Sequence, residues 1–209
     1  MSEKFVVETG RACLLAVPNI DTDVIIPQTE LATISKSGLA DGLFARWRYG
    51  TGRELNPDFV LNKPAHRGCR FLIAAANFGC GSSREHAVWA LRDFGIRAVI
   101  SPAFAEIFFR NALRNGLLAA TVAPNDYERL AAAAAANDGG LDLIVDLPNQ
   151  RVVADDVVVP FVIGAEDKRR LLRGTDEIEE TLEHLCDIDT FIAADRGRRP
   201  WIYETPWSQ

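Results

Sequence analysis

The middle of the chain alternates strand-like and helix-like segments, and this alternation restricts the fold more than any other feature of the sequence. Short apolar runs that indicate strands are each followed by a segment with helical periodicity: 71–76 by 86–94, 98–100 by 103–115, and 118–122 by 126–136. Alternation of this kind is typical of parallel βαβ units. Gly116 ends the second helical segment and Gly139 follows the third, as expected at helix C-termini. We therefore predict an α/β fold built around parallel strands.

Segments on both sides of this region predict additional strands and helices. Residues 5–7 and 13–17 are interpreted as two paired strands joined around Thr9 and Gly10. Three short runs in the last third predict a β-meander with tight turns, at residues 143–147, 151–154 and 157–159. The helical patterns that follow the meander cover residues 165–173 and 177–185.

Two segments in the first third lack regular periodicity. Residues 18–27 have a proline at each end and contain two acids, which argues against regular secondary structure. Residues 28–63 combine glycines, prolines and aromatic side chains, and we predict a long irregular segment there. Loops of this length are usually either functional or disordered.

The composition excludes several classes of protein. The 209 residues suffice for one sizeable domain or a domain with an appendage, and the net charge of −6 argues against nucleic acid as the main partner. The N-terminus leads into a strand pattern without a secretory signal, and no apolar run approaches the roughly 18 residues that span a membrane. The four cysteines form no C-x-x-C pair, which favours free thiols in a reducing cytoplasm. The same scatter leaves no recognisable spacing for an iron–sulfur cluster in this chain.

A glycine-rich turn, Asn77–Ala87, separates the first strand of the alternating region from its helix. This geometry directs free backbone N–H groups at an anion. Two interpretations are open for Ser82 and Ser83: either one caps the helix and nothing is bound, or both hydroxyls contact a bound carboxylate or phosphate. Arg84 favours the second, because a cation in the first helical turn opposes the helix dipole at a cost of roughly 0.3–1 kcal/mol. A bound anion would remove that cost through a bidentate contact.

The same turn fails the patterns of several better-known sites. It lacks the third glycine of G-x-G-x-x-G and the Lys-Ser/Thr ending of a P-loop, and the hydrolase elbow G-x-S-x-G is absent. A serine hydrolase that uses Ser82, His86 and Asp93 is therefore disfavoured. His86 is better interpreted as a packing or surface residue, and Cys80 as either a reactive thiol at a helix start or a small buried side chain.

The acidic motif Asp21-Thr22-Asp23 lies in the first of the two irregular segments. Two acids at this spacing can bind a metal or orient a histidine, or they can form an Asx-turn with no other role. The neighbouring apolar residues Ile25 and Ile26 are expected to bury and fix the motif. Lys36, farther along, is an isolated cation of a kind that is usually solvated.

The acidic motif with its continuation to Pro27, and the glycine-rich turn, resemble the two signatures of the small subunits of 3-isopropylmalate dehydratases. These proteins are the detached swivel domain of the aconitase superfamily. The resemblance covers roughly residues 1–195 and includes three further stretches, at residues 43–49, 56–62 and 101–108. It implies a swivelling β/β/α domain, similar to the aconitase C-terminal domain, with a mixed sheet or barrel flanked by helices. Residues 1–195 would form this single domain, and residues 196–209 a C-terminal tail.

The resemblance also implies a partner and a reaction. The partner would be a larger subunit that carries a four-iron–four-sulfur cluster, with no cofactor or metal in this chain. The two chains would convert 2-isopropylmalate to 3-isopropylmalate through isopropylmaleate, in leucine biosynthesis.

Residue roles follow from the same resemblance. Ser82 matches the serine whose alkoxide removes a proton from the carbon next to a carboxylate. Asp23 matches an acid that pairs with a catalytic histidine of the large subunit. Ser83 and Arg84 match residues that bind a substrate carboxylate, and Lys36 falls near a substrate-binding arginine of the superfamily. The segment 30–39 would recognise the isopropyl group.

Two other hypotheses are consistent with the sequence. The chain could serve a related dicarboxylic-acid hydro-lyase, such as a homoaconitase or a citraconate or dimethylmalate dehydratase. It could instead be a non-catalytic module that holds an anion in the glycine-rich turn.

Overall fold

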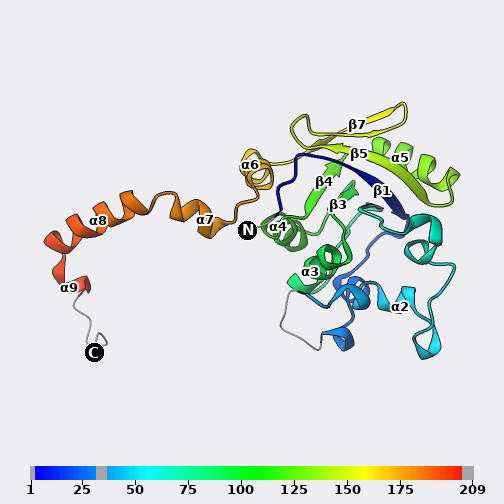
Figure 1. Ribbon diagram of the computed structural model, residues 1–209, viewed down its shortest axis with the longest axis horizontal. Coiled ribbons are helices and arrows are strands. Elements are labelled where there is room, and N and C mark those ends of the chain that lie inside the picture. Colours follow the sequence, from blue (N-terminus) through cyan, green and yellow to red (C-terminus); the bar gives the residue numbers. More distant parts are fainter. Residues whose placement is uncertain (1–2, 32–36, 204–209) are drawn as a thin grey trace. The chain divides into compact units, whose positions relative to one another are not determined.

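The computed structural model describes residues 3–31 and 37–203, and its seven strands within those residues form a closed barrel (Figure 1). The strands are β1 (Val7–Leu15), β2 (Phe71–Ala74), β3 (Ala98–Ser101), β4 (Leu118–Val122), β5 (Gly140–Asp146), β6 (Arg151–Ala154) and β7 (Val157–Val162). Their order around the barrel is β1-β2-β3-β4-β7-β6-β5. The prediction of an α/β fold with a mixed sheet or barrel flanked by helices is confirmed.

The barrel has a parallel half and an antiparallel half. Strands β1 to β4 pair in parallel, and the helices that follow β2, β3 and β4 are α3 (Glu85–Phe94), α4 (Glu106–Arg114) and α5 (Pro124–Ala136). Parallel neighbours need such crossovers, whereas the short turns between β5, β6 and β7 allow antiparallel pairing. Strands β2 and β3 are buried at every position, which explains their continuous apolar runs. The three predicted strand–helix pairs and the meander are confirmed, with shifted ends.

Strand β1 corrects the prediction of two paired strands at its position. It runs without a break from Val7 to Leu15, pairs in parallel with β2, and pairs antiparallel with β5. Gly10 lies inside the strand and does not form a turn. A Cβ at this residue would lie 2.8 Å from Cδ of Arg70, so the glycine makes room for that side chain.

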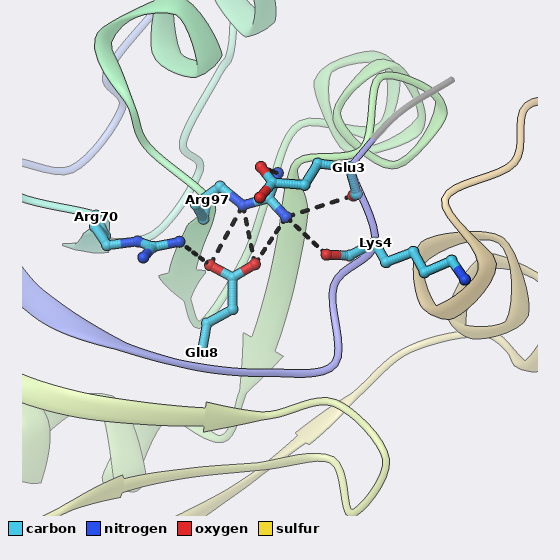
Figure 2. A network of polar contacts seen from close by, with 5 residues as sticks. All are labelled: Glu3, Lys4, Glu8, Arg70 and Arg97. Atoms are coloured by element: carbon cyan, nitrogen blue, oxygen red, sulfur yellow. Dashed lines mark hydrogen bonds and ion pairs between the residues drawn. The ribbon is translucent and has the colours of Figure 1, made fainter.

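A charged network joins β1 to the residues that precede β2 and β3 (Figure 2). The carboxylate of Glu8 accepts hydrogen bonds from Arg70 at 2.6 Å and from Nη2 of Arg97 at 2.7 Å. The same nitrogen of Arg97 also contacts the backbone carbonyls of Glu3 and Lys4. Because the Arg97 side chain is only 8% exposed, these contacts hold a nearly buried charge in place.

In the long segment before β2, the residues that the structure describes contain no helix longer than a single turn. These single turns are α1 (Thr22–Ile25), η1 (Gln28–Glu30), η2 (Ala40–Gly42), α2 (Ala45–Arg48), η3 (Thr51–Arg53), η4 (Val60–Asn62) and η5 (Pro64–His66). The prediction for residues 28–63 is confirmed in the part that the structure describes, but residues 18–27 do contain one regular turn, α1. Buried side chains such as Ile25, Leu43 and Phe44 pack this segment against α3 in a second hydrophobic core beside the barrel.

The chain forms two compact units, residues 1–174 and 175–209. The first ends after α6 (Ala165–Arg173), at Gly174 with φ +70°. The second holds α7 (Glu177–Leu182), α8 (Leu185–Arg198) and α9 (Pro200–Tyr203). The predicted division after residue 195 instead falls inside α8. Asp195 explains this continuity, because it accepts hydrogen bonds from Arg199 and Tyr203 and so joins the end of α8 to α9. Among the helices of the described residues, none is both long and apolar enough for a membrane span.

Candidate active site

The acidic motif and the glycine-rich turn lie side by side although some 60 residues separate them. Asp21 and Cys80 pair as in a parallel ladder, and the backbone N–H of Thr22 donates to the carbonyl of Cys80 at 2.9 Å. The buried hydroxyl of Thr22 donates to the carbonyl of Ser82 at 2.8 Å. The two motifs therefore form one site, and Thr22, to which the sequence assigned no role, joins them.

The glycine-rich turn is pressed against α4. Gly79 has φ +77°, and a Cβ there would overlap the ring of Phe108. Phe78 packs edge-on against the same ring, with centroids 5.2 Å apart. Residues 103–105, which were predicted as the start of the helix, are instead extended and exchange backbone hydrogen bonds with Phe78. This pairing delays the start of α4 until Glu106 and brings its first turns to the site.

Neither serine of the turn caps α3. The N-cap is Arg84, with φ −122°, and it makes no side-chain capping bond. The contact of Thr22 with Ser82 holds the backbone out of the helix until Glu85. Both Ser82 and Ser83 are exposed, and within the described residues their hydroxyls make no hydrogen bond. The interpretation of these serines as simple helix caps is wrong.

Arg84 and Asp23 form an ion pair between the two motifs. Nη1 of Arg84 donates to Oδ1 of Asp23 at 2.5 Å, and the side chains are 18% and 40% exposed. Ion pairs of this exposure contribute roughly 0–1 kcal/mol to stability, so the contact fixes the guanidinium more than it stabilises the fold. The remaining N–H groups of Arg84 can still donate to a ligand.

Asp21 has a different role from Asp23. Its side chain caps α1 by accepting a hydrogen bond from the N–H of Val24 at 2.7 Å. The interpretation of the acidic motif as a local turn cap is therefore confirmed for Asp21 alone.

Two cavities meet at Ser83 and Arg84. The first has a volume of about 230 Å³ and lies between the turn and the first turns of α4; it is lined by Ser82, Ser83, Arg84, Ile107, Phe108 and Asn111, among others. The second, of about 460 Å³, extends from Arg84 to Leu31 and Trp89. A larger cavity of about 540 Å³ over β1, β5 and β6 contains none of the predicted site residues. Lys36 lies outside the described residues, and its role stays a prediction.

The alternative catalytic triad is contradicted. Oδ2 of Asp93 accepts hydrogen bonds from the backbone N–H groups of Leu39 and Ala40, at 2.7 and 2.9 Å. Asp93 therefore anchors the irregular segment to α3 and does not orient a histidine. The ring of His86 packs against Trp89 with centroids 4.7 Å apart, which confirms its interpretation as a packing residue.

Comparisons with known proteins identify the family of the chain. Residues 2–125 match the family described as the aconitase C-terminal domain. The 3-isopropylmalate dehydratase small subunit of Cupriavidus necator is 48% identical over 204 residues, which cover 96% of this chain and 98% of that protein. The chain belongs to the family of 3-isopropylmalate dehydratase small subunits. The Agrobacterium fabrum member is likewise 48% identical, over 95% of this chain and 99% of its own.

A solved structure supports the same assignment of fold. The crystal structure of 3-isopropylmalate dehydratase from Methanocaldococcus jannaschii superposes with a TM-score of 0.65 at 26% identity, and the match covers 88% of this chain and 99% of that one. The family resemblance drawn from the acidic motif and the glycine-rich turn is therefore confirmed, as is the fold of the aconitase C-terminal domain.

The sequence assigned no site residue to α4. The structure adds Phe108, which supports the turn, and Asn111, which lines the smaller cavity. Their spacing of three places both on one helix face, but a sequence alone does not say which face meets the turn.

Proposed function

We propose that this chain is the small subunit of a 3-isopropylmalate dehydratase. With an iron–sulfur large subunit it would interconvert 2-isopropylmalate and 3-isopropylmalate, through isopropylmaleate, in leucine biosynthesis. The observation that carries the proposal is the convergence of Ser82, Ser83 and Arg84 on one cavity beside Asp23, in a member of this family.

Ser82 is the proposed base. Its Oγ takes a proton from the carbon next to a substrate carboxylate, so a C–H bond breaks and an O–H bond forms; in the reverse direction the proton returns to carbon. A free serine hydroxyl is far too weak an acid to lose its proton at neutral pH. The N-terminus of α3 and the guanidinium of Arg84 supply the positive field that favours the alkoxide. The lack of a capping role leaves the hydroxyl available for this chemistry.

Ser83 and Arg84 are the proposed carboxylate-binding residues. Arg84 is held by Asp23 through one nitrogen, which leaves its other donors for the substrate. Within the described part of the chain, Oδ2 of Asp23 accepts no hydrogen bond, so it can accept one from a histidine of the large subunit. Lys36 remains a proposed additional cation for the substrate.

The side chains present do not fit an iron–sulfur cluster. Among the described residues, no group of three or more His, Cys, Asp or Glu side chains is placed to hold a metal ion. Cys13 and Cys69 are neighbours in the core, where the hydrogen bond between them and burial raise the pKa of Cys69 and favour the neutral thiol. The proposal therefore assigns the cluster to the large subunit, where it would act as a Lewis acid on the departing hydroxyl. The free thiols also support a reducing cytoplasm as the location.

The test combines this chain with a cluster-loaded large subunit from the same source under anaerobic conditions. Turnover of 3-isopropylmalate is followed as isopropylmaleate absorbance, for the wild type and for Ser82→Ala. The proposal expects activity that needs both chains and is lost in the variant, while size-exclusion chromatography shows an unchanged complex. A wild-type complex that turns over only another dicarboxylic acid would point to a related hydro-lyase. Absence of any complex would favour the anion-binding module.

A further inference from the structure

Two asparagines lie one turn apart at the end of α4, Asn111 within the helix and Asn115 at its C-cap, and their surroundings differ sharply. Asn115 is buried, and its side chain is fully engaged: Oδ1 accepts from the indole of Trp89 at 3.1 Å, and Nδ2 donates to Glu85 at 2.7 Å and to the carbonyl of Asn111 at 2.9 Å. These bonds join α4 to α3, so the role of Asn115 is structural.

Asn111 has no such engagement. It is half-buried and lines the 230 Å³ cavity together with Ser82, Ser83 and Arg84. Within the described residues its side-chain amide makes no hydrogen bond. A carboxamide has two donors and an acceptor. The cavity beside it is also lined by a guanidinium and two hydroxyls, so a ligand bound there would be the hydrogen-bond partner of the amide.

The position of Asn111 is fixed from both sides. Phe108, one turn earlier, meets the backbone of Gly79 so closely that no side chain fits between them. Asn115, one turn later, donates to the carbonyl of Asn111 itself. A side chain on a helix held in this way is presented to a ligand at little cost in ordering.

We propose that Asn111 is a substrate-binding residue that donates a hydrogen bond from Nδ2 to a carboxylate bound by Ser83 and Arg84. The inference rests on the proposed function and extends its substrate site to α4. The chemistry favours a carboxylate, because Arg84 gives the cavity a cation and bonds to charged acceptors are the stronger kind. Glu106 also lines the cavity, but its carboxylate is 76% exposed and pairs with Arg110 at 2.6 Å, which limits its repulsion of an anion.

The test compares Asn111→Ala and Asn111→Asp with the wild type in the complex with the large subunit. Calorimetric titration measures the affinity for 3-isopropylmalate and for succinate, a dicarboxylate without hydroxyl or branch. Loss of a hydrogen bond to a charged group weakens binding roughly ten- to a hundred-fold, and we expect this for both acids in Asn111→Ala. Asn111→Asp keeps the size but places a negative charge beside the ligand, so it should bind more weakly still.

Asn115→Ala is the matched control. It should lower the unfolding temperature, because it removes the hydrogen bonds that Asn115 makes with the indole of Trp89 and with the carboxylate of Glu85. Asn111→Ala should leave that temperature unchanged or slightly raised, because alanine is the better helix former. A weaker affinity at unchanged stability cannot arise from a structural role.

Three results distinguish this inference from the proposed function. If both Asn111 variants bind both acids within twofold of the wild type, the inference is refuted. The proposed function is not refuted by this result, because it rests on turnover by the wild-type complex. If only 3-isopropylmalate binds more weakly, Asn111 contacts the hydroxyl or the branch of the substrate, and the carboxylate assignment is wrong. If the wild-type complex binds dicarboxylates without turning over 3-isopropylmalate, and Asn111→Ala weakens that binding, the proposed reaction fails and the inference stands.

Discussion

Replacing Gly79 by alanine should damage the site through one defined contact. The residue has φ +77°, where an alanine costs roughly 1–2 kcal/mol. The added methyl would also lie 2.5 Å from Cβ of Phe108. Because that atom is at the root of the side chain, rotation of the ring cannot relieve the overlap, and overpacking of this kind costs about 1–3 kcal/mol. Together these terms predict a loss of about 2–5 kcal/mol in the free energy of unfolding.

A matched change at Gly95 separates the backbone cost from the cost of the overlap. It has φ +105°, but a Cβ there would meet nothing within 4 Å, so Gly95→Ala should show the backbone cost without the overlap. Urea unfolding of both variants measures the difference. The double variant Gly79→Ala/Phe108→Ala should be non-additive by only part of the overlap cost of about 1–3 kcal/mol, because it removes the contacts with Cγ and Cδ2 of Phe108 but keeps the contact with Cβ at 2.5 Å. Equal losses for Gly79→Ala and Gly95→Ala would refute the claim that close approach of the turn to α4 requires a glycine.

Three further changes test the remaining contacts. Arg84→Lys should lower kcat/KM for the complex roughly 10- to 100-fold with little change in stability, because one ammonium cannot hold Asp23 and chelate a carboxylate in the manner of a guanidinium; steady-state kinetics would show otherwise if lysine suffices. Asp93→Ala should lower the free energy of unfolding by about 1–3 kcal/mol and speed hydrogen exchange at the backbone amides of Leu39 and Ala40, because both amides lose their acceptor. Unchanged exchange would contradict the claim that Asp93 anchors the irregular segment to α3. Asn149 and Arg151 lower the pKa of Asp146 below its usual value, so its contribution to stability is present above the unfolded pKa of roughly 3.9 and is lost as the pH falls through the folded pKa. The acid dependence of unfolding should therefore be shallower in Asp146→Asn, and identical profiles would exclude this role.

The parallel half of the barrel could be predicted from sequence because its signals are local. Strands buried on both faces give continuous apolar runs, as at Phe71–Ala74, and the intervening helices show their own periodicity. The N-terminal strand was harder, because Gly10 has the same appearance in a turn as in a strand that passes a neighbouring side chain. Only the position of Arg70, some 60 residues away, decides between them. Closure of the barrel by pairing of β1 with β5 is equally non-local.

The site could be predicted only in part, because some of its signals are local in the sequence and others are not. Ser82, Ser83 and Arg84 are adjacent in sequence, and their residue types alone indicate an anion site. The ion pair of Arg84 with Asp23 and the link through Thr22 connect motifs that composition cannot place together. The start of α3 was predicted to within one residue, at His86 instead of Glu85, but the capping role considered for the serines was wrong, because residue types do not reveal the hydrogen bond from Thr22 to the carbonyl of Ser82.

The order of the strands explains why these distant segments meet. The acidic motif follows β1, the glycine-rich turn follows β2, and the segment that leads to α4 follows β3. Because β1, β2 and β3 are parallel neighbours, their carboxyl ends lie at one edge of the sheet, where ligands of α/β proteins commonly bind. The hydroxyl of Ser101, at the end of β3, donates to the carbonyl of Ala75, just after the end of β2, and so joins the segments that follow these two strands. Strand order therefore brings together the proposed base Ser82 after β2, the acid Asp23 after β1 and the amide of Asn111 after β3. Any change that shifts β1 against β2 should therefore separate Asp23 from Arg84 before it unfolds the barrel.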